Sequence, residues 1–166
     1  MPKLTVVAIA LVTFFAGALL GAFGMREMCR WTLISYDTAN IDHLSTLVSI
    51  QRFQGTPEAY EAALHKYLIA LDERERAHSS VLMRNDVFFS GEMVYADRTF
   101  TYIRLSLLAA QRGRADEAAK YQGMAMAACP RAMWKRCTWD DLSRLVQMVD
   151  EHSMWNPQRS VPNHGS

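Results

Sequence analysis

The N-terminal segment of the chain places the strongest constraint on what it can fold into. From Leu4 to Met25 there is no charged residue, and only Thr5 and Thr13 carry a hydroxyl group. As a helix rising about 1.5 Å per residue, this stretch spans on the order of 30 Å, the thickness of the hydrocarbon core of a bilayer. The remaining residues, about 140 in number, could hardly surround such a helix in a soluble core. The sequence therefore predicts one N-terminal transmembrane helix.

This segment is either a permanent anchor or a cleaved signal peptide. Lys3 supplies a positive start, and Ala22 and Gly24 are small residues at the spacing of a cleavage site. However, the apolar run is longer than a usual signal-peptide core, and no helix breaker precedes Gly24. These features favour an uncleaved anchor. The alternative is a secreted soluble helical protein released near Gly24, either an enzyme or an inhibitor.

The anchor also carries a face of small residues. Gly17 and Gly21 form a G-x-x-x-G pattern, which lets two membrane helices approach closely. A homodimer through the anchor is therefore a hypothesis, beside the plain observation that small residues are common in membrane helices. The number of positive charges is similar on the two sides of the anchor, with Lys3 and the amino terminus before it and Arg26 and Arg30 after it. Charge alone therefore does not orient the anchor in the membrane.

Beyond Arg30 the apolar residues recur at helical spacing, and no segment alternates as a half-buried strand does. We expect an all-α fold in which residues 1–30 form the anchor and juxtamembrane segment, 31–155 a small helical bundle, and 156–166 a disordered tail. Segment 84–93 is expected to be a break, with residues 87–89 in a loop or a short strand. The first body helix is expected to start at a cap among Asp37, Thr38 and Asn40. The others are expected over 57–83, 92–112 and 115–129, and after the cap Thr138.

The segment from Thr99 to Ala132 has the pattern of a helical hairpin. Gly113 stands at the turn, Ala118 and Ala125 are small packing residues, and Pro130 ends the unit. In this spacing the segment resembles a single tetratricopeptide repeat, the 34-residue helix–turn–helix unit. Tyr102 and Leu105 match the pattern, whereas Ser106, Ala109 and Gln122 depart from it. The spacing of Gly55 and Gly113 does not fit the repeat length, so a regular array is excluded.

The resemblance implies where a partner would bind. In the repeat family the first helix of each unit lines a concave groove, and the corresponding positions here are Phe100, Ile103, Leu107, Ala110 and Gln111. From the residues alone they form an apolar stripe that something must cover. The helix expected over 57–83 would make this stripe part of the core, whereas a partner helix or peptide would make it a groove.

Two cysteines bracket a short connector. Cys129 and Cys137 lie at the ends of the segment between the fourth and fifth expected helices, within reach of a disulfide. A structural disulfide implies an oxidising compartment such as the periplasm. Cys29 is left as an odd cysteine, which could pair between chains of a dimer.

Neither composition nor motifs point to catalysis. With 18 Lys and Arg against 17 Asp and Glu, the net charge of +1 gives no basic stripe, so we expect no nucleic-acid partner. There is no phosphate loop, nucleophile elbow or zinc-protease motif, and we expect no enzyme, cofactor or metal. Met124 and Met126 cannot face one copper ion together, and methionine is ordinary core filler.

Together these features predict a membrane-anchored helical protein–protein interaction module, an adaptor or accessory subunit of an envelope assembly with an unknown protein partner. The combination of anchor and tetratricopeptide-like body resembles envelope proteins of bacteria. It implies a single-pass protein of the bacterial inner membrane with its C-terminal domain in the periplasm.

Overall fold

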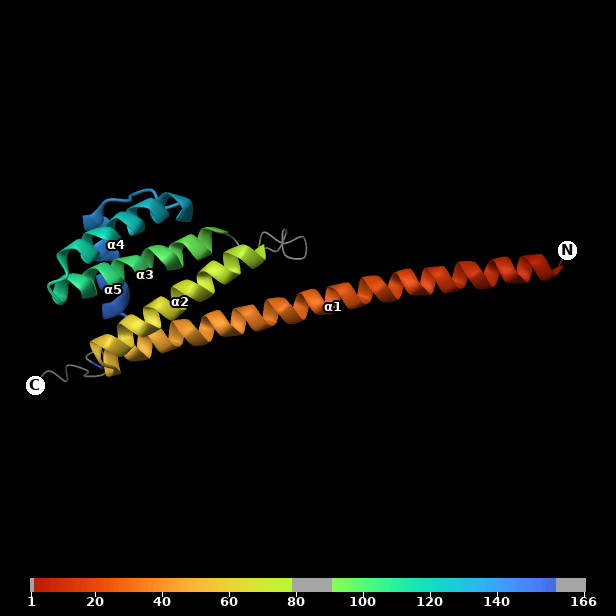
Figure 1. The fold of residues 1–166 in the computed structure, drawn as a ribbon, viewed down its shortest axis with the longest axis horizontal. Coiled ribbons are helices and arrows are strands. Elements are labelled where there is room, and N and C mark those ends of the chain that lie inside the picture. Colours follow the sequence, from red (N-terminus) through yellow and green to blue (C-terminus); the bar gives the residue numbers. More distant parts are fainter. Residues whose placement is uncertain (1, 79–90, 158–166) are drawn as a thin grey trace, which may run out of the picture. The chain divides into compact units, whose positions relative to one another are not determined.

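The computed structural model describes residues 2–78 and 91–157, and it divides the chain into two compact units, 1–39 and 40–166. No strand occurs in these two ranges, which confirms the all-α class (Figure 1). The described part of the tail ends at Pro157, and residues 79–90, including 84–90 of the break expected at 84–93, lie outside the description. Residues 91–93 of that expected break belong to α3 instead. The elements are α1 (Pro2–Gln54), α2 (Pro57–His78), α3 (Gly91–Gln111), α4 (Ala115–Ala128), the short 3-10 helix η2 (Cys129–Ala132) and α5 (Trp139–Glu151).

Helix α1 is longer than the sequence predicts. It runs unbroken through residues 37–40, so the expected cap at Asp37, Thr38 or Asn40 is wrong, and the expected boundary after residue 30 falls inside a helix. Neither Gly nor Pro occurs between Met25 and Gln54, so nothing interrupts the backbone. Hydroxyl groups within α1 bond to the helix's own carbonyls, as where Thr32 donates to the Met28 carbonyl at 2.9 Å.

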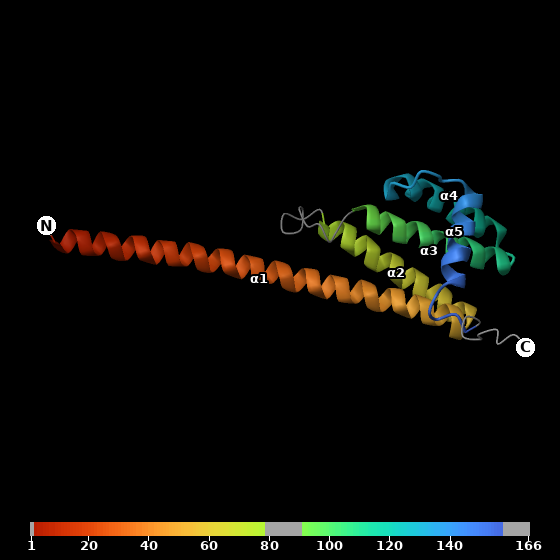
Figure 2. The same cartoon turned by 180° about the vertical axis from the view of Figure 1, so that it is seen from behind.

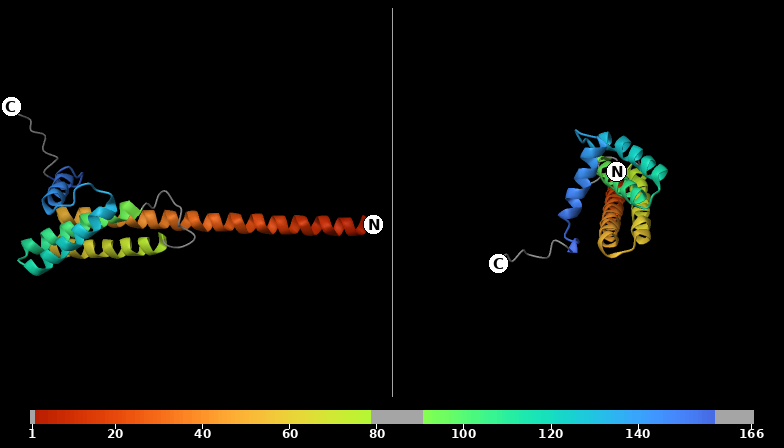
Figure 3. Two further views of the ribbon diagram at one scale, coloured as in Figure 1. Left: turned by 90° about the horizontal axis from the view of Figure 1, so that it is seen from above. Right: turned by 90° about the vertical axis from the view of Figure 1, so that its left-hand side faces the viewer.

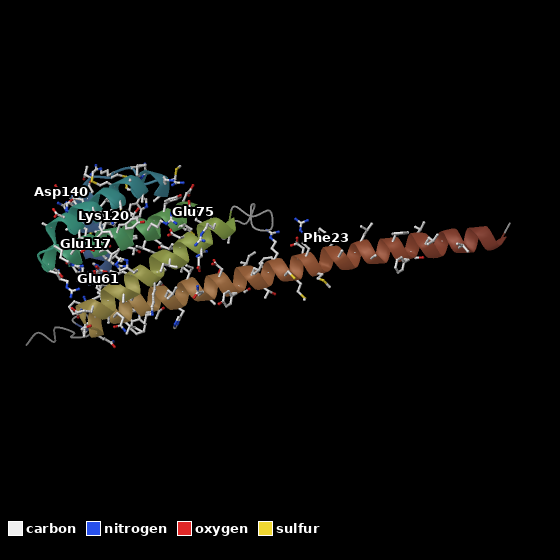
Figure 4. The ribbon with its side chains drawn as sticks, viewed as in Figure 1. Phe23, Glu61, Glu75, Glu117, Lys120 and Asp140 are labelled. Carbon is white, nitrogen blue, oxygen red and sulfur yellow. A yellow bond between two sulfur atoms is a disulfide. The ribbon has the colours of Figure 1, made fainter. Side chains whose placement is uncertain are left out.

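The first unit exposes its apolar side chains. Phe14, Leu19 and Phe23 of α1 keep most of their surface uncovered. Phe23 is labelled in Figure 4. By length and composition, α1 contains a stretch able to cross a membrane. A stretch of this kind serves as a membrane anchor or as a signal sequence. Around Gly17 and Gly21 there is open space on the helix surface.

The core of the body has one cluster where α2 packs against α3. Gly55 makes the preceding turn tight, since a Cβ there would lie 2.7 Å from the Gln51 carbonyl oxygen. Thr56 then caps α2 by accepting a hydrogen bond from the Ala59 amide at 3.2 Å. This first cluster takes buried side chains from residues 40–54 of α1 and from α2, α3 and α4: Ile41, Val48, Tyr60, Leu64, Tyr67, Leu71, Val94, Leu105, Leu108 and Tyr121.

Helices α3 and α4 form the hairpin that the sequence predicts (Figure 3). Gly113 lies at the turn with φ +73°, a conformation that side-chain-bearing residues rarely adopt. Ser106 donates to the Ala118 carbonyl at 2.9 Å, and Ala125 is fully buried. The small residues at 106, 118 and 125 therefore let the two helices approach closely.

Helix α5 packs against α3 on the side that carries Ile103 (Figure 2). Thr138 is its cap, as predicted, because it accepts a hydrogen bond from the Asp141 amide at 3.3 Å. Leu142, Val146 and Asp150 are its buried residues, and their spacing places them on one side of the helix. The second cluster joins α5 to the hairpin through Ile103, Ala125, Cys129, Leu142 and Val146.

Candidate functional site

The positions expected to form a partner groove fall into two groups. Phe100, Ile103 and Leu107 belong to the second cluster, where they pack against α5, and Ile103 has no exposed surface. Ala110 and Gln111 are exposed. The chain's own α5 therefore covers most of the stripe. Helix α2, which the sequence suggests as the cover, packs instead on the face that carries Leu105 and Leu108.

A disulfide holds the connector before α5. Cys129 and Cys137 are bonded, with their Cα atoms 5.8 Å apart, as the connector's spacing predicts. Cys129 is fully buried in the second cluster, and Cys137 packs against the same cluster two positions before α5 begins. The bridge therefore fixes the start of α5 beside the hairpin. Cys29 is an exposed free cysteine in the first unit.

The far end of α5 is held by charge. Asp150, only 5% exposed, pairs with Arg52 of α1 at 2.7 Å and with Arg104 of α3 at 2.8 Å. Arg52 also donates to the Tyr60 hydroxyl at 3.1 Å. Because each carboxylate oxygen has its own guanidinium, the buried charge is compensated from two helices. We call Arg52, Arg104 and Asp150 the arginine clamp.

The sequence does not predict the arginine clamp, although the spacing of residues on α5 contains one indication of it. Leu142 and Val146 repeat at four-residue spacing along the buried side of α5, and Asp150 is the next position in that series. A carboxylate that continues an apolar stripe must meet a cationic partner when the stripe is buried. The partners themselves lie 46 residues away or more along the chain, and local spacing does not identify them.

Two clefts flank the arginine clamp. The first has a volume of about 310 Å³ and lies at the α1–α2 turn, where Arg52, Tyr60, Arg104 and Gln111 line it together with Phe53, Gly55, Thr56, Pro57, Leu107 and Leu108. We call it the turn cleft. The second, about 390 Å³, lies beside the end of α5 and contains Asp150. The two arginines line both clefts, so they separate one space from the other.

A second polar pair joins α2 to α3 and consists of Tyr67, which belongs to the first cluster, and Asp97. Tyr67 is hydrogen-bonded to Asp97, which raises the pKa of the phenol beyond the effect of burial. Burial raises the pKa of Asp97 above its ordinary value, and the hydrogen bond from Tyr67 and the charges of Arg74 and Arg104 only partly oppose this. The pair thus favours a proton on Tyr67 over the whole neutral range.

Ion pairs also join helices at the surface (Figure 4). Glu61 of α2 pairs with Arg112 and Arg114 at the hairpin turn. Burial opposes ionisation of Glu61, but hydrogen bonds and charge from the two arginines outweigh it and lower the pKa of this carboxyl. The pKa of Glu75 is also lowered, first by the hydrogen bond from Tyr95 and then by Arg98.

Methionine side chains on the body are exposed rather than buried. The six that are described there retain 37–83% of their surface, namely Met93, Met124, Met126, Met133, Met148 and Met154. Their expected role as core filler is therefore wrong, because alanine and branched residues fill the core beside α4. Among residues 2–78 and 91–157, no group of three or more His, Cys, Asp or Glu side chains is placed to hold a metal ion.

The body has exposed apolar side chains, a charged cleft and a disulfide-fixed helix, but comparison with known proteins adds no identity to them. No family model, no curated protein and no solved structure matches this chain.

Proposed function

We propose that the chain is a membrane-anchored helical module that binds another protein through exposed methionines, as an adaptor or accessory subunit of an envelope assembly. The observation that carries this proposal is the exposure of every described methionine on the body. Methionine is unbranched and polarisable, so it adapts to partner surfaces and is favoured at binding sites. A body that only had to remain soluble would gain nothing from leaving these apolar side chains in water.

Five of the six exposed methionines form two sets along the chain, and the sixth, Met93, lies on α3. Met124, Met126 and Met133 lie on α4 and just after η2, whereas Met148 and Met154 lie at the end of α5 and beyond it. The second set adjoins the cleft that contains Asp150, whose lining includes Met154 and Trp155. Because this cleft combines apolar and charged groups, the second set is the better candidate for a specific partner.

The proposal extends to location and assembly. Helix α1 would remain as a single-pass anchor in a bacterial inner membrane, and the disulfide supports a periplasmic position for the body, since such bonds persist in oxidising compartments. The α3–α4 hairpin would be a solitary tetratricopeptide-like unit. Close packing at Gly17 and Gly21 would allow a homodimer through the anchor.

Photo-crosslinking in intact cells tests the binding proposal. A photoreactive amino acid is placed at Met154 in one variant and at Met133 in another, both in the full-length chain. We expect a discrete protein adduct at one position, and we expect the adduct to disappear when the other methionines of the same set are changed to Gln.

The matched control places the same photoreactive group at Lys120, an exposed position on the middle of α4. Adducts of equal yield and pattern at Lys120 and at both methionine positions would mean random collision and would contradict the proposal. A body that yields no protein adduct at any methionine position would likewise contradict the proposal.

A further inference from the structure

We infer that the turn cleft binds a small organic carboxylate, held between Arg52 and Arg104, with its apolar part against Phe53 and Leu107. This inference does not depend on the proposed protein partner, because it concerns the turn cleft. The methionines at the end of α5 adjoin the neighbouring cleft, which shares Arg52 and Arg104 with the turn cleft.

The charge of the turn cleft favours an anion. Two arginines line it, and none of its described lining residues is acidic. Asp150 neutralises one of the two positive charges, but it lies in the neighbouring cleft rather than in this one. The charged residues that line the turn cleft are therefore all positive, which favours an anion such as a carboxylate.

Asp150 also prepares the arginines for a ligand. It contacts Arg52 at 2.7 Å and Arg104 at 2.8 Å, and these contacts hold both guanidinium groups in place. A guanidinium has five N–H donors, so it retains donors after pairing with one carboxylate oxygen. Groups already fixed by packing and ion pairs lose little freedom when a ligand binds, and this raises affinity.

The hydroxyl groups of the turn cleft also act as donors. Tyr60 accepts a hydrogen bond from Arg52, and Thr56 accepts one from the Ala59 amide, so each hydroxyl has its own hydrogen left to donate. Burial raises the pKa of Tyr60, although the nearby arginines oppose this, and the phenol keeps its proton at neutral pH. A cleft with several converging donors suits a ligand that has only acceptor oxygens.

The remaining lining describes the rest of the ligand. Phe53, Leu107 and Leu108 give the turn cleft an apolar wall, and its volume of about 310 Å³ is at the lower end of the range for small-molecule sites. The ligand is therefore a small carboxylate with an apolar body, of the size of an aromatic or branched-chain acid.

Titration of the full-length protein in detergent micelles with benzoate tests the inference. Benzamide has the same shape without the charge, and it serves as the matched ligand. We expect benzoate to bind at least about tenfold more tightly than benzamide at low ionic strength, because only benzoate pairs with the arginines. Ligand-observed NMR measures both affinities.

A variant at the edge of the turn cleft makes the test specific. Gln111 is exposed, so Gln111→Glu should fold normally and place a repelling charge in the cleft, lowering benzoate affinity about tenfold. Gln147→Glu is the control, since it makes the same charge change at an exposed position of α5 outside both clefts. Arg52→Gln should also lower benzoate affinity, and its fold is checked by circular dichroism.

Three results would overturn the inference. These are equal binding of benzoate and benzamide, benzoate binding that Gln111→Glu leaves unchanged, and tighter binding of inorganic phosphate than of benzoate. None of them bears on the methionine surfaces, so failure here is distinguishable from failure of the proposed function.

Discussion

Asp150 is the residue at which charge and packing meet in the body. Its carboxylate is buried and its compensation comes from Arg52 and Arg104 on two other helices. In Asp150→Asn the two guanidinium groups lose their counter-charge while remaining partly buried. Because the arginine side chains keep 28% and 16% of their surface, solvent screens part of the loss, and we expect a destabilisation of about 1–3 kcal/mol.

Urea unfolding of the full-length protein, followed by tryptophan fluorescence, measures this change. Glu151→Gln is the matched control, since it neutralises the exposed neighbouring carboxylate and should alter stability by less than about 0.5 kcal/mol. Equal stability of Asp150→Asn and the unchanged protein would mean that the arginine clamp contributes nothing to the fold.

The lowered pKa values of Glu61 and Glu75 predict how the stability of the fold changes at low pH. The arginines around Glu61, and Tyr95 and Arg98 beside Glu75, lower the pKa of both carboxyls below the ordinary value of 4.5. A lowered pKa stabilises the folded state above the ordinary value, and this contribution is lost as pH falls through the native pKa. We therefore expect stability to decrease below about pH 4.5, and the double variant Glu61→Gln, Glu75→Gln to show a shallower decrease.

Urea midpoints measured between pH 3 and pH 7 test this prediction, with Glu73→Gln as the control at an exposed position of the same helix. An unchanged slope in the double variant would exclude these ion pairs as its source. Buried Asp97 acts in the opposite direction, since its raised pKa favours the folded state at low pH and this effect is lost as pH rises through the native value.

At the scale of single residues, local signals are predictable and long-range ones are not. The cap at Thr138 follows from the acidic residues directly after it, and Gly113 follows from the turn it must make. The partners of Asp150 and Glu61 lie on other helices, and no spacing within one helix encodes them. The turn cleft is assembled from α1, α2 and α3, so the sequence analysis identified only Gln111 among its polar lining.

Helix α5 contributes two buried apolar side chains to the core, those of Leu142 and Val146. Leu142 is almost fully buried against Ile103 and Cys129, whereas Val149 on the same helix is 43% exposed. We expect Leu142→Ala to destabilise the body by about 2–5 kcal/mol, since it removes buried methyl groups and leaves a cavity. Val149→Ala should cost well under about 1 kcal/mol. Similar losses in urea unfolding for both variants would contradict the assignment of the buried face.

The disulfide stabilises the same element by a different route. Closing the short loop between Cys129 and Cys137, which are eight positions apart, contributes about 2–3 kcal/mol in the chain-entropy model. We expect the double variant Cys129→Ser, Cys137→Ser to lose stability by that amount in thermal and urea unfolding. The reducing agent that lowers the stability of the unchanged protein should leave the variant unaffected.

At the scale of elements, the sequence predicts which segments are helical better than how they pack. The hairpin and α5 were predicted because turn and cap residues mark their ends. The continuity of α1 is not predictable in this way, because Asp37, Thr38 and Asn40 favour caps over helix interiors, and yet the helix runs through them. An apolar stripe on α3 predicts that it is buried, but nothing in its spacing specifies that α5 rather than α2 covers it.

The intact mass of the membrane-extracted protein tests the organisation of the whole chain. We expect a full-length species of 18.9 kDa, in which alkylation without reduction modifies one cysteine, Cys29, and alkylation after reduction modifies all three. A chain that begins near Met25 would identify only the part of α1 before that residue as a signal sequence. Three cysteines modified without reduction would contradict the disulfide and the periplasmic proposal together.

The position of the disulfide also affects how α5 moves. Cys137 lies two positions before the helix begins. The start of α5 therefore stays beside the hairpin when Leu142, Val146 and Asp150 separate from their partners. Such a short tether gives the detached helix an effective concentration in the millimolar range or above. Return to the hairpin is intramolecular with or without the bridge, but the bridge shortens the tether and so limits how far the detached helix can move away. Opening of α5 should therefore be brief and local, and amide exchange in α5 should be much faster in the reduced protein than in the oxidised one.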